Sequence, residues 1–172
     1  MTASPSTTNY QYGAGAAFLK LDGDSEFRHV GNLKEMTYAS EIQTLEHKQT
    51  MSGLKSIDFE AVTEVSASIN AVLDEVSPEN MALFVMGTVG DTDTGGHIEI
   101  IGLSDTTLEG QFKYVSDNPY GRNFELHCRV SIRPNGDFSF ITEDLTSIPI
   151  TMKVLKVAGE FTRWVFIETP AN

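Results

Sequence analysis

One segment of the chain, residues 91–96, has the acidic and glycine residues with which a helical calcium-binding loop begins. Aspartates stand at its first and third positions and a glycine at its sixth. The fifth position is Gly95 and the twelfth is Gly102, where such a loop needs an oxygen donor and a bidentate glutamate. The sequence therefore predicts a flexible surface loop here, without a metal site.

The single cysteine, Cys128, lies in an alternating apolar segment and cannot form an intrachain disulfide. The adjacent His127 would point to the opposite face of a strand, because successive side chains alternate. A buried small thiol is therefore favoured over a nucleophile. The histidines show none of the spacings of a zinc site; they are His29, His47, His97 and His127.

The sequence contains neither a complete dinucleotide-binding motif nor the motif of a hydrolase nucleophile. Residues 13–18 resemble a dinucleotide fingerprint, but they lack its third glycine and precede a predicted strand where the motif needs a helix. The sequence also lacks the G-x-S-x-G motif of a nucleophile elbow. We therefore expect no catalytic residue, no cofactor and no metal, and hence no enzyme.

The overall charge limits the partners. Asp and Glu number 24 against 12 Lys and Arg, which gives a formal net charge of −12. Such a field repels nucleic acid and anionic membranes, so stable DNA binding is not expected. No stretch approaches the roughly 20 apolar residues that span a bilayer, so no membrane insertion is expected either.

A long strand with alternating apolar and polar residues is predicted over residues 57–74. The apolar residues occupy every second position and are expected to be buried. The residues between them point to the other face of the strand and include an acidic stripe. An amphipathic helix is the competing interpretation, but many β-branched residues and two serines favour the strand. The apolar set is Ile57, Phe59, Ala61, Val65, Ala67, Ile69, Ala71 and Leu73, and the acids are Asp58, Glu60, Glu64 and Asp74.

A short capped helix follows this strand. Ser77 is a good N-cap, Pro78 suits the first helical position, and Glu79 places an acid in the positive first turn. Gly87 is the expected stop after the helix. The helix is expected to cover one face of a β core.

The rest of the chain predicts short strands joined by tight turns. Four strand pairs are expected: residues 16–22 with 26–30, residues 97–103 with 107–115, residues 124–133 with 138–142, and residues 148–157 with 161–168. A long protruding loop or a splayed hairpin is expected over residues 43–57, with a flexible arm over 1–15, one domain over 16–169 and a tail over 170–172. The predicted fold class is mainly β, a sandwich or barrel of two packed antiparallel sheets with one flanking helix.

Three features in this order resemble a known family. They are the motif E-x-x-T-L-E-H at residues 41–47, the long alternating strand, and the motif S-P-E-N-M-A-L-F at residues 77–84 followed by Gly87. The chain resembles the major tail tube proteins of long-tailed bacteriophages. The resemblance implies the tail-tube fold, with hexameric rings that stack into a hollow tube for genomic DNA.

The same resemblance implies partners and site residues. The partners are further copies of the chain, the tape measure protein, the tail terminator, distal tail proteins and passing double-stranded DNA. The location is the virion tail, after assembly in the host cytoplasm. Asp58, Glu60, Glu64 and Asp74 would face the lumen, and the residues contacting the next ring would be Leu45, Glu46, His47, Lys48, Gln49, Met51 and Lys55.

Two alternatives stay open at this stage. One is the inner tube of a contractile injection system, which shares the fold and differs by a surrounding sheath. The other is a β-sandwich module that binds a ligand as a monomer.

Overall fold

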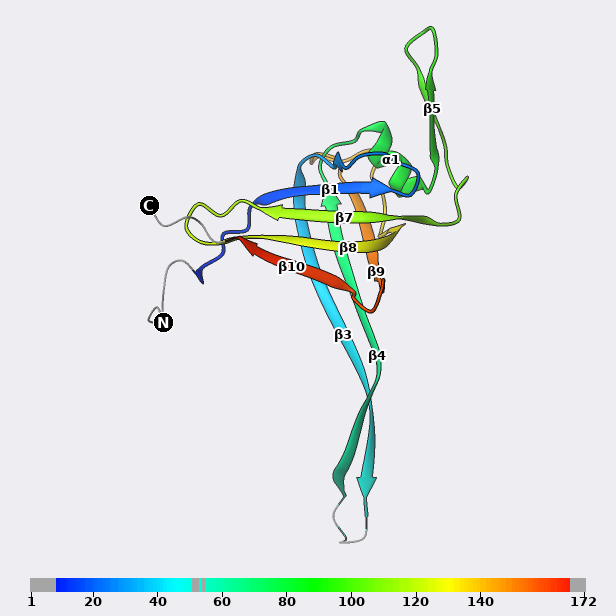
Figure 1. Cartoon of the computed structure of the whole chain (residues 1–172). Coiled ribbons are helices and arrows are strands. Elements are labelled where there is room, and N and C mark those ends of the chain that lie inside the picture. Colours follow the sequence, from blue (N-terminus) through cyan, green and yellow to red (C-terminus); the bar gives the residue numbers. More distant parts are fainter. Residues whose placement is uncertain (1–8, 51–52, 54, 168–172) are drawn as a thin grey trace.

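The computed structural model describes residues 9–50, 53 and 55–167, and it is mainly β with one short helix in this part of the chain (Figure 1). The predicted fold class is therefore confirmed. The expected arm lies outside these residues over 1–8, as do Met51 and the expected tail over 170–172. The elements are β1 (Gly15–Leu21), β2 (Arg28–His29), β3 (Leu33–Gln49), β4 (Ser56–Leu73), α1 (Pro78–Val85), β5 (Thr88–Thr92), β6 (Ile98–Ile101), β7 (Leu108–Ser116), β8 (Asn123–Pro134), β9 (Ile148–Leu155) and β10 (Thr162–Ile167).

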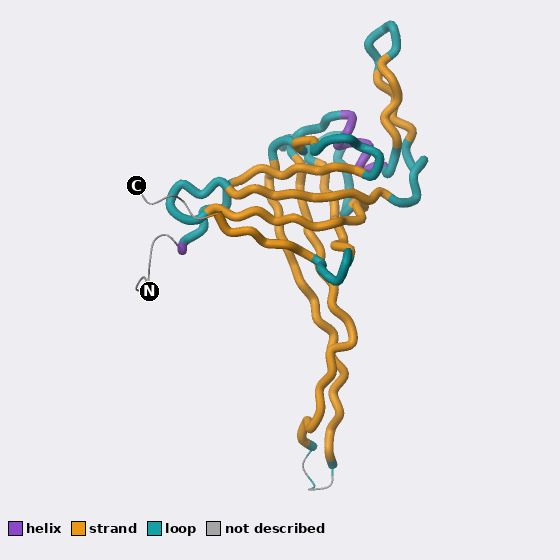
Figure 2. The backbone as a smooth tube through the Cα atoms, in the orientation of Figure 1, coloured by secondary structure: helices purple, strands orange, loops and turns teal. Residues whose placement is uncertain are grey.

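Most strands belong to one antiparallel sheet that folds over itself into two layers. Its order is β2-β1-β7-β8-β9-β4-β3, and β10 pairs with β8 beside this path. The strands β1, β7, β8 and β10 cross the steep strands β9, β4 and β3 (Figure 1, Figure 2). A second sheet, β5 and β6, extends as a hairpin from the end of the molecule that carries α1.

The core fills the space between the two layers. Alternate residues of the second half of β4 point into it, as do alternate residues of β9 and β8. Val130, Ile132 and Ile148 have no exposed surface. The other buried members are Ala17, Leu19, Val30, Ala67, Ile69, Ala71, Leu73, Leu83, Leu108, Phe112, Leu126, Ile150, Met152 and Val154.

The helix begins at the predicted cap. The backbone N–H of Asn80 donates to Ser77 Oγ at 3.2 Å, and Pro78 is the first helical residue. At the other end Met86 takes the left-handed conformation, with φ 50°, and the N–H of Gly87 donates to the Ala82 carbonyl. A Cβ at Gly87 would lie 2.3 Å from the Ile101 carbonyl oxygen, so this glycine also permits close packing on β6.

Several predicted strand pairs differ from the structure. The pair of residues 16–22 and 26–30 is confirmed, since β1 lies antiparallel to β2. The strand β6 pairs with β5 instead of β7, which lies between β1 and β8. The strand β10 pairs with β8 instead of β9. Turn residues fix local reversals, but each strand's partner follows from packing of the whole sheet, which alternation does not encode.

Residues 138–142 do not form the predicted strand. The chain bends before them at Gly136, which has the positive φ of 105° that favours glycine. Beyond the turn Phe138 packs against Phe84 of α1, with 6.0 Å between ring centroids. Contact with the helix replaces the expected pairing with β8.

Candidate assembly surface

The most prominent feature outside the core is a two-stranded projection, here called the hairpin arm (residues 42–49 and 56–65). It extends far beyond the two layers (Figure 1, Figure 2). Pairing between β4 and β9 begins only at Ser68, so within the described residues β4 pairs with β3 alone along the arm. Of the two alternatives for residues 43–57, the structure shows the hairpin and not the loop, because β3 continues to Gln49 and β4 begins at Ser56.

The polar side chains of these residues left both a loop and a hairpin open at the level of the sequence. The ladder of the hairpin pairs the backbone groups that face each other, and no described segment covers the side chains, so the side chains need no alternation between core and water. The described residues expected to contact a neighbouring ring are exposed: Leu45, Glu46, His47, Lys48 and Gln49 on β3 of the arm, and Lys55 immediately before β4. Their contact with another copy stays a prediction.

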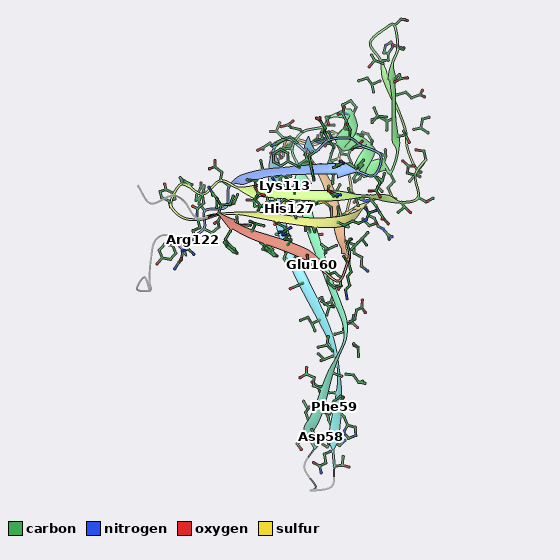
Figure 3. All side chains as sticks on the ribbon, viewed as in Figure 1. Asp58, Phe59, Lys113, Arg122, His127 and Glu160 are labelled. Carbon is green, nitrogen blue, oxygen red and sulfur yellow. The ribbon has the colours of Figure 1, made fainter. Side chains whose placement is uncertain are left out.

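Exposed apolar side chains distinguish the arm from an ordinary solvated hairpin. Leu45 is 62% exposed and Phe59, labelled near the free end in Figure 3, is 59% exposed. The other exposed apolar residues of the arm are Ile42, Ile57, Val62 and Val65. Contiguous exposed apolar groups of this kind mark surfaces that bind a partner.

Two β-bulges divide the faces of the arm. The register passes from Gln43 opposite Glu64 to Thr44 opposite Val62, which leaves Thr63 as an extra residue on β4. A second shift leaves Asp58 extra. Each extra residue exchanges the two faces of β4 relative to β3. The two faces therefore both carry apolar groups: Ile42, Val62, Val65 and Ile57 on one, and Leu45, Ala61 and Phe59 on the other.

The structure contradicts two expectations for residues 57–74: the apolar set is not buried along the arm, and the acids do not form a stripe on one face. Ile57, Phe59 and Val65 are exposed, because no second layer covers the arm. Glu64 opposite Gln43 and Glu60 opposite Glu46 lie on different faces. In the sequence, Thr63 is only a polar residue among alternating apolar ones. The sequence therefore did not reveal that the register changes there.

The remaining two acids have local partners. Asp58 Oδ1 lies 2.6 Å from His47 Nδ1 across the arm, and Figure 3 places Asp58 beside Phe59. Asp74 lies just beyond β4 and accepts a hydrogen bond from the Asn32 side chain at 2.7 Å. Exposed ion pairs of this type contribute little to stability, so the arm is not held by its charges.

The solvent side of the layer formed by β3, β4, β9 and the end of β8 is here called the polar face. Small residues dominate it, with Ser68 opposite Lys153 and Asn70 opposite Thr151. Charged residues of both signs lie among them. The polar face comprises Glu35, Thr37, Ala39, Glu41, Glu64, Ser66, Ser68, Asn70, Val72, Ser131, Arg133, Pro149, Thr151 and Lys153.

A second exposed apolar surface lies at the opposite end of β4 and is here called the far-end segment (residues 137–145). Phe140 is 91% exposed, Ile141 97% and Leu145 87%. Phe138 anchors the segment to α1 through Phe84. Sequence reasoning missed this surface, because the alternation of Phe138 and Phe140 indicated a strand instead.

The candidate calcium loop forms the turn between β5 and β6. Asp93 Oδ1 accepts hydrogen bonds from the N–H groups of Gly95 and His97, both at 2.8 Å. The bonds from His97 hold the pKa of Asp93 below its usual value. In residues 9–50, 53 and 55–167, no group of three or more His, Cys, Asp or Glu side chains is arranged to hold a metal ion.

Cys128 lies on β8 with the inward parity of Leu126 and Val130 and packs partly buried against the core. Burial raises the pKa of its thiol to about 12. His127 lies on the other face, where its Nε2 is 2.9 Å from Glu125 Oε2. The thiol is therefore protonated at neutral pH and has no activating histidine beside it.

We expect Cys128 to resist alkylation in the folded protein. With a thiol pKa of about 12, at pH 8 the thiolate fraction is roughly 100-fold or more below that of an ordinary cysteine. Iodoacetamide labelling followed by mass spectrometry should show slow modification in buffer and rapid modification in urea. Equal rates in both would contradict the buried position of the thiol.

The fold and the candidate site together define a mainly β protein with a projecting hairpin whose exposed apolar side chains form a candidate surface for association. The chain belongs to the family described as "Protein of unknown function UCP028589", whose model matches residues 10–99, just over half of the chain. The matched region includes the whole hairpin arm and α1. No curated protein matches the chain. Over the part that the structure describes, no helix is long and apolar enough to cross a membrane.

Proposed function

We propose that the protein is a structural subunit that polymerises into stacked hexameric rings, forming a hollow tube of the kind found in long-tailed phage tails. The observation that carries this proposal is the hairpin arm, which exposes apolar side chains on both faces outside the core. A two-stranded ribbon gains little from its own packing in water, so contact with another molecule would stabilise it.

Open strand edges support closure into a ring. In the described residues, β3 has a sheet partner only in β4, and β10 only in β8. Such edges are templates for pairing with another chain, and closure into a ring removes them. Aromatic contacts bring the edge strands together within the subunit, since Tyr38 of β3 lies 5.5 Å from Trp164 of β10 between ring centroids.

The polar face is proposed to line the lumen. Its small polar side chains offer few groups that hold a phosphate backbone, and acids slightly outnumber bases on it. The net charge of −12 also opposes retention of DNA. Of the expected lumen residues, Glu64 belongs to this face, while Glu60 lies on the other face of the arm.

The proposed function implies a location and partners for the protein. The tube would be part of a virion tail assembled in the bacterial cytoplasm, with tape measure, terminator and distal tail proteins at its ends. DNA would pass during ejection without stable binding.

Replacing residues 48–55 by a short Gly-Ser linker tests this function. The described residues of this segment, 48–50, 53 and 55, are exposed at the free end of the arm, so thermal unfolding of the subunit should stay nearly unchanged. Sedimentation at rising concentration should show large assemblies for the parent chain and subunits alone for the variant. A parent that sediments as a monomer at all concentrations would refute the proposed function.

A further inference from the structure

The basic residues of the polar face lie together. They are Arg133 of β8 and Lys153 of β9, whereas the acids of this face lie on β3 and β4. Arg133 stands opposite Thr151 and Lys153 stands opposite Ser131, so the two cations are diagonal neighbours on adjacent strands. Diagonal neighbours in an antiparallel pair lie about 7–8 Å apart, so both long side chains can reach the same anion.

No carboxylate of the subunit neutralises these two cations. Arg129, also on β8, has such a partner, since its Nη2 lies 3.0 Å from Glu109 Oε2. Within the part of the chain that the structure describes, the side chains of Arg133 and Lys153 form no ion pair and no hydrogen bond. The chain has 24 acids against 12 Lys and Arg, so two adjacent cations without a carboxylate leave positive charge available to an external anion.

Hydroxyl groups surround the two cations. Ser68 and Ser131 stand opposite Lys153 on its two neighbouring strands, and Thr151 stands opposite Arg133. These five residues line a hollow of about 440 Å³ in the polar face. The side chains around the cations are small, so the hollow has room for an oxyanion to which both cations and the hydroxyl groups can donate.

We propose that this hollow is a phosphate-contact site and that in the tube it touches the backbone of passing DNA. The guanidinium and ammonium groups give charge-assisted hydrogen bonds to phosphate oxygens, and each hydroxyl group can rotate to add a neutral one. The choice of DNA as the source of the phosphate rests on the proposed function. The hollow itself belongs to a single subunit and does not depend on assembly.

The contact is expected to be weak and sensitive to salt. One acid, Glu41, also lines the hollow, but it lies on β3, about 10 Å from β9 because β4 runs between them. This carboxylate and the net charge of −12 oppose a tighter hold. Two cations correspond to about two neutralised phosphates, so a tenfold rise in salt should weaken duplex binding roughly 60-fold.

Amide chemical shifts of the isotope-labelled full chain test the site, at a concentration at which sedimentation shows single subunits. Sodium phosphate added at constant ionic strength should shift the resonances of Ser131, Arg133, Thr151 and Lys153 to saturation. Arg133→Gln/Lys153→Gln should weaken phosphate binding roughly 10-fold or more.

Lys34→Gln/Arg163→Gln is the matched control. It also removes one lysine and one arginine, and both are exposed outside the polar face. This control should bind phosphate as the parent does. An equal loss in both variants would show that the effect comes from net charge and would overturn the site.

Titrations with two polyanions identify the source of the anion. A short DNA duplex should shift the same resonances as inorganic phosphate and should lose binding with salt at the expected rate. Binding of inorganic phosphate without binding of the duplex would overturn the DNA contact. Equally tight binding of poly-glutamate would indicate a site for acidic protein segments and would overturn the phosphate assignment.

The outcomes also separate this inference from the proposed function. Resonances that do not move with phosphate, or that move equally in Arg133→Gln/Lys153→Gln, would overturn the site even if the protein forms tubes. A parent chain that binds phosphate in the hollow but never assembles would overturn the tube and leave the site in place.

Discussion

Replacing Leu45 and Phe59 by serine should abolish assembly and leave the subunit folded. The two side chains lie on one face of the hairpin arm and are 62% and 59% exposed, so the folded monomer loses little buried area. Burying such side chains at an interface contributes about 1.5 kcal/mol or more each. Loss of both should weaken every contact by roughly 100-fold or more, and the effect repeats along the tube.

Sedimentation velocity and thermal unfolding measure the two parts of this expectation. Tyr120→Ser is the control, because it removes an exposed aromatic ring from the turn between β7 and β8, away from the arm. The control should assemble like the parent. If the Leu45→Ser/Phe59→Ser variant forms assemblies at the parental concentration, the arm does not supply the contact.

Replacing Asn80 by alanine should destabilise the subunit by roughly 2–4 kcal/mol. Asn80 is 1% exposed and joins three segments. Its Nδ2 donates to the Val30 and Glu75 carbonyls, both at 2.9 Å, and its Oδ1 accepts from Arg28 at 2.8 Å. Removal of the amide leaves these groups buried or half-buried without their bonds, so α1 loses its attachment to β2 and to the residue Val30 that follows it.

Urea unfolding gives the free energy of this change. Asn135→Ala is the matched control, because Asn135 is exposed and its side chain makes only a long contact, 3.5 Å, with Asn70. The control should change the free energy of unfolding by less than about 0.5 kcal/mol. An equally small change for Asn80→Ala would show that the buried amide does not hold the helix in place.

The elements that depend on local chemistry were predictable from the sequence. The strand β4 follows from apolar residues at alternating positions and from a high content of β-branched residues. The helix start follows from Ser77 and Pro78, whose capping geometry is fixed within a few residues. The inward position of Cys128 follows from alternation in the same way. These signals are short-range, so they do not depend on the partner of the segment.

The strand partners and the faces of the arm were not predictable in this way. The segment containing Phe138 and Phe140 has the alternation of a strand, but contact with α1 decides its structure. Alternation also cannot show whether a second layer exists above Ile57 and Phe59, or that Thr63 shifts the register. Packing between distant segments settles both questions, and the sequence holds no local record of it.

Negative-stain electron microscopy of the concentrated protein tests the central claim most directly. The account predicts rings of six subunits with a hollow centre, stacked into tubes whose length increases with protein concentration. Isolated particles of the size of one subunit at every concentration would contradict it.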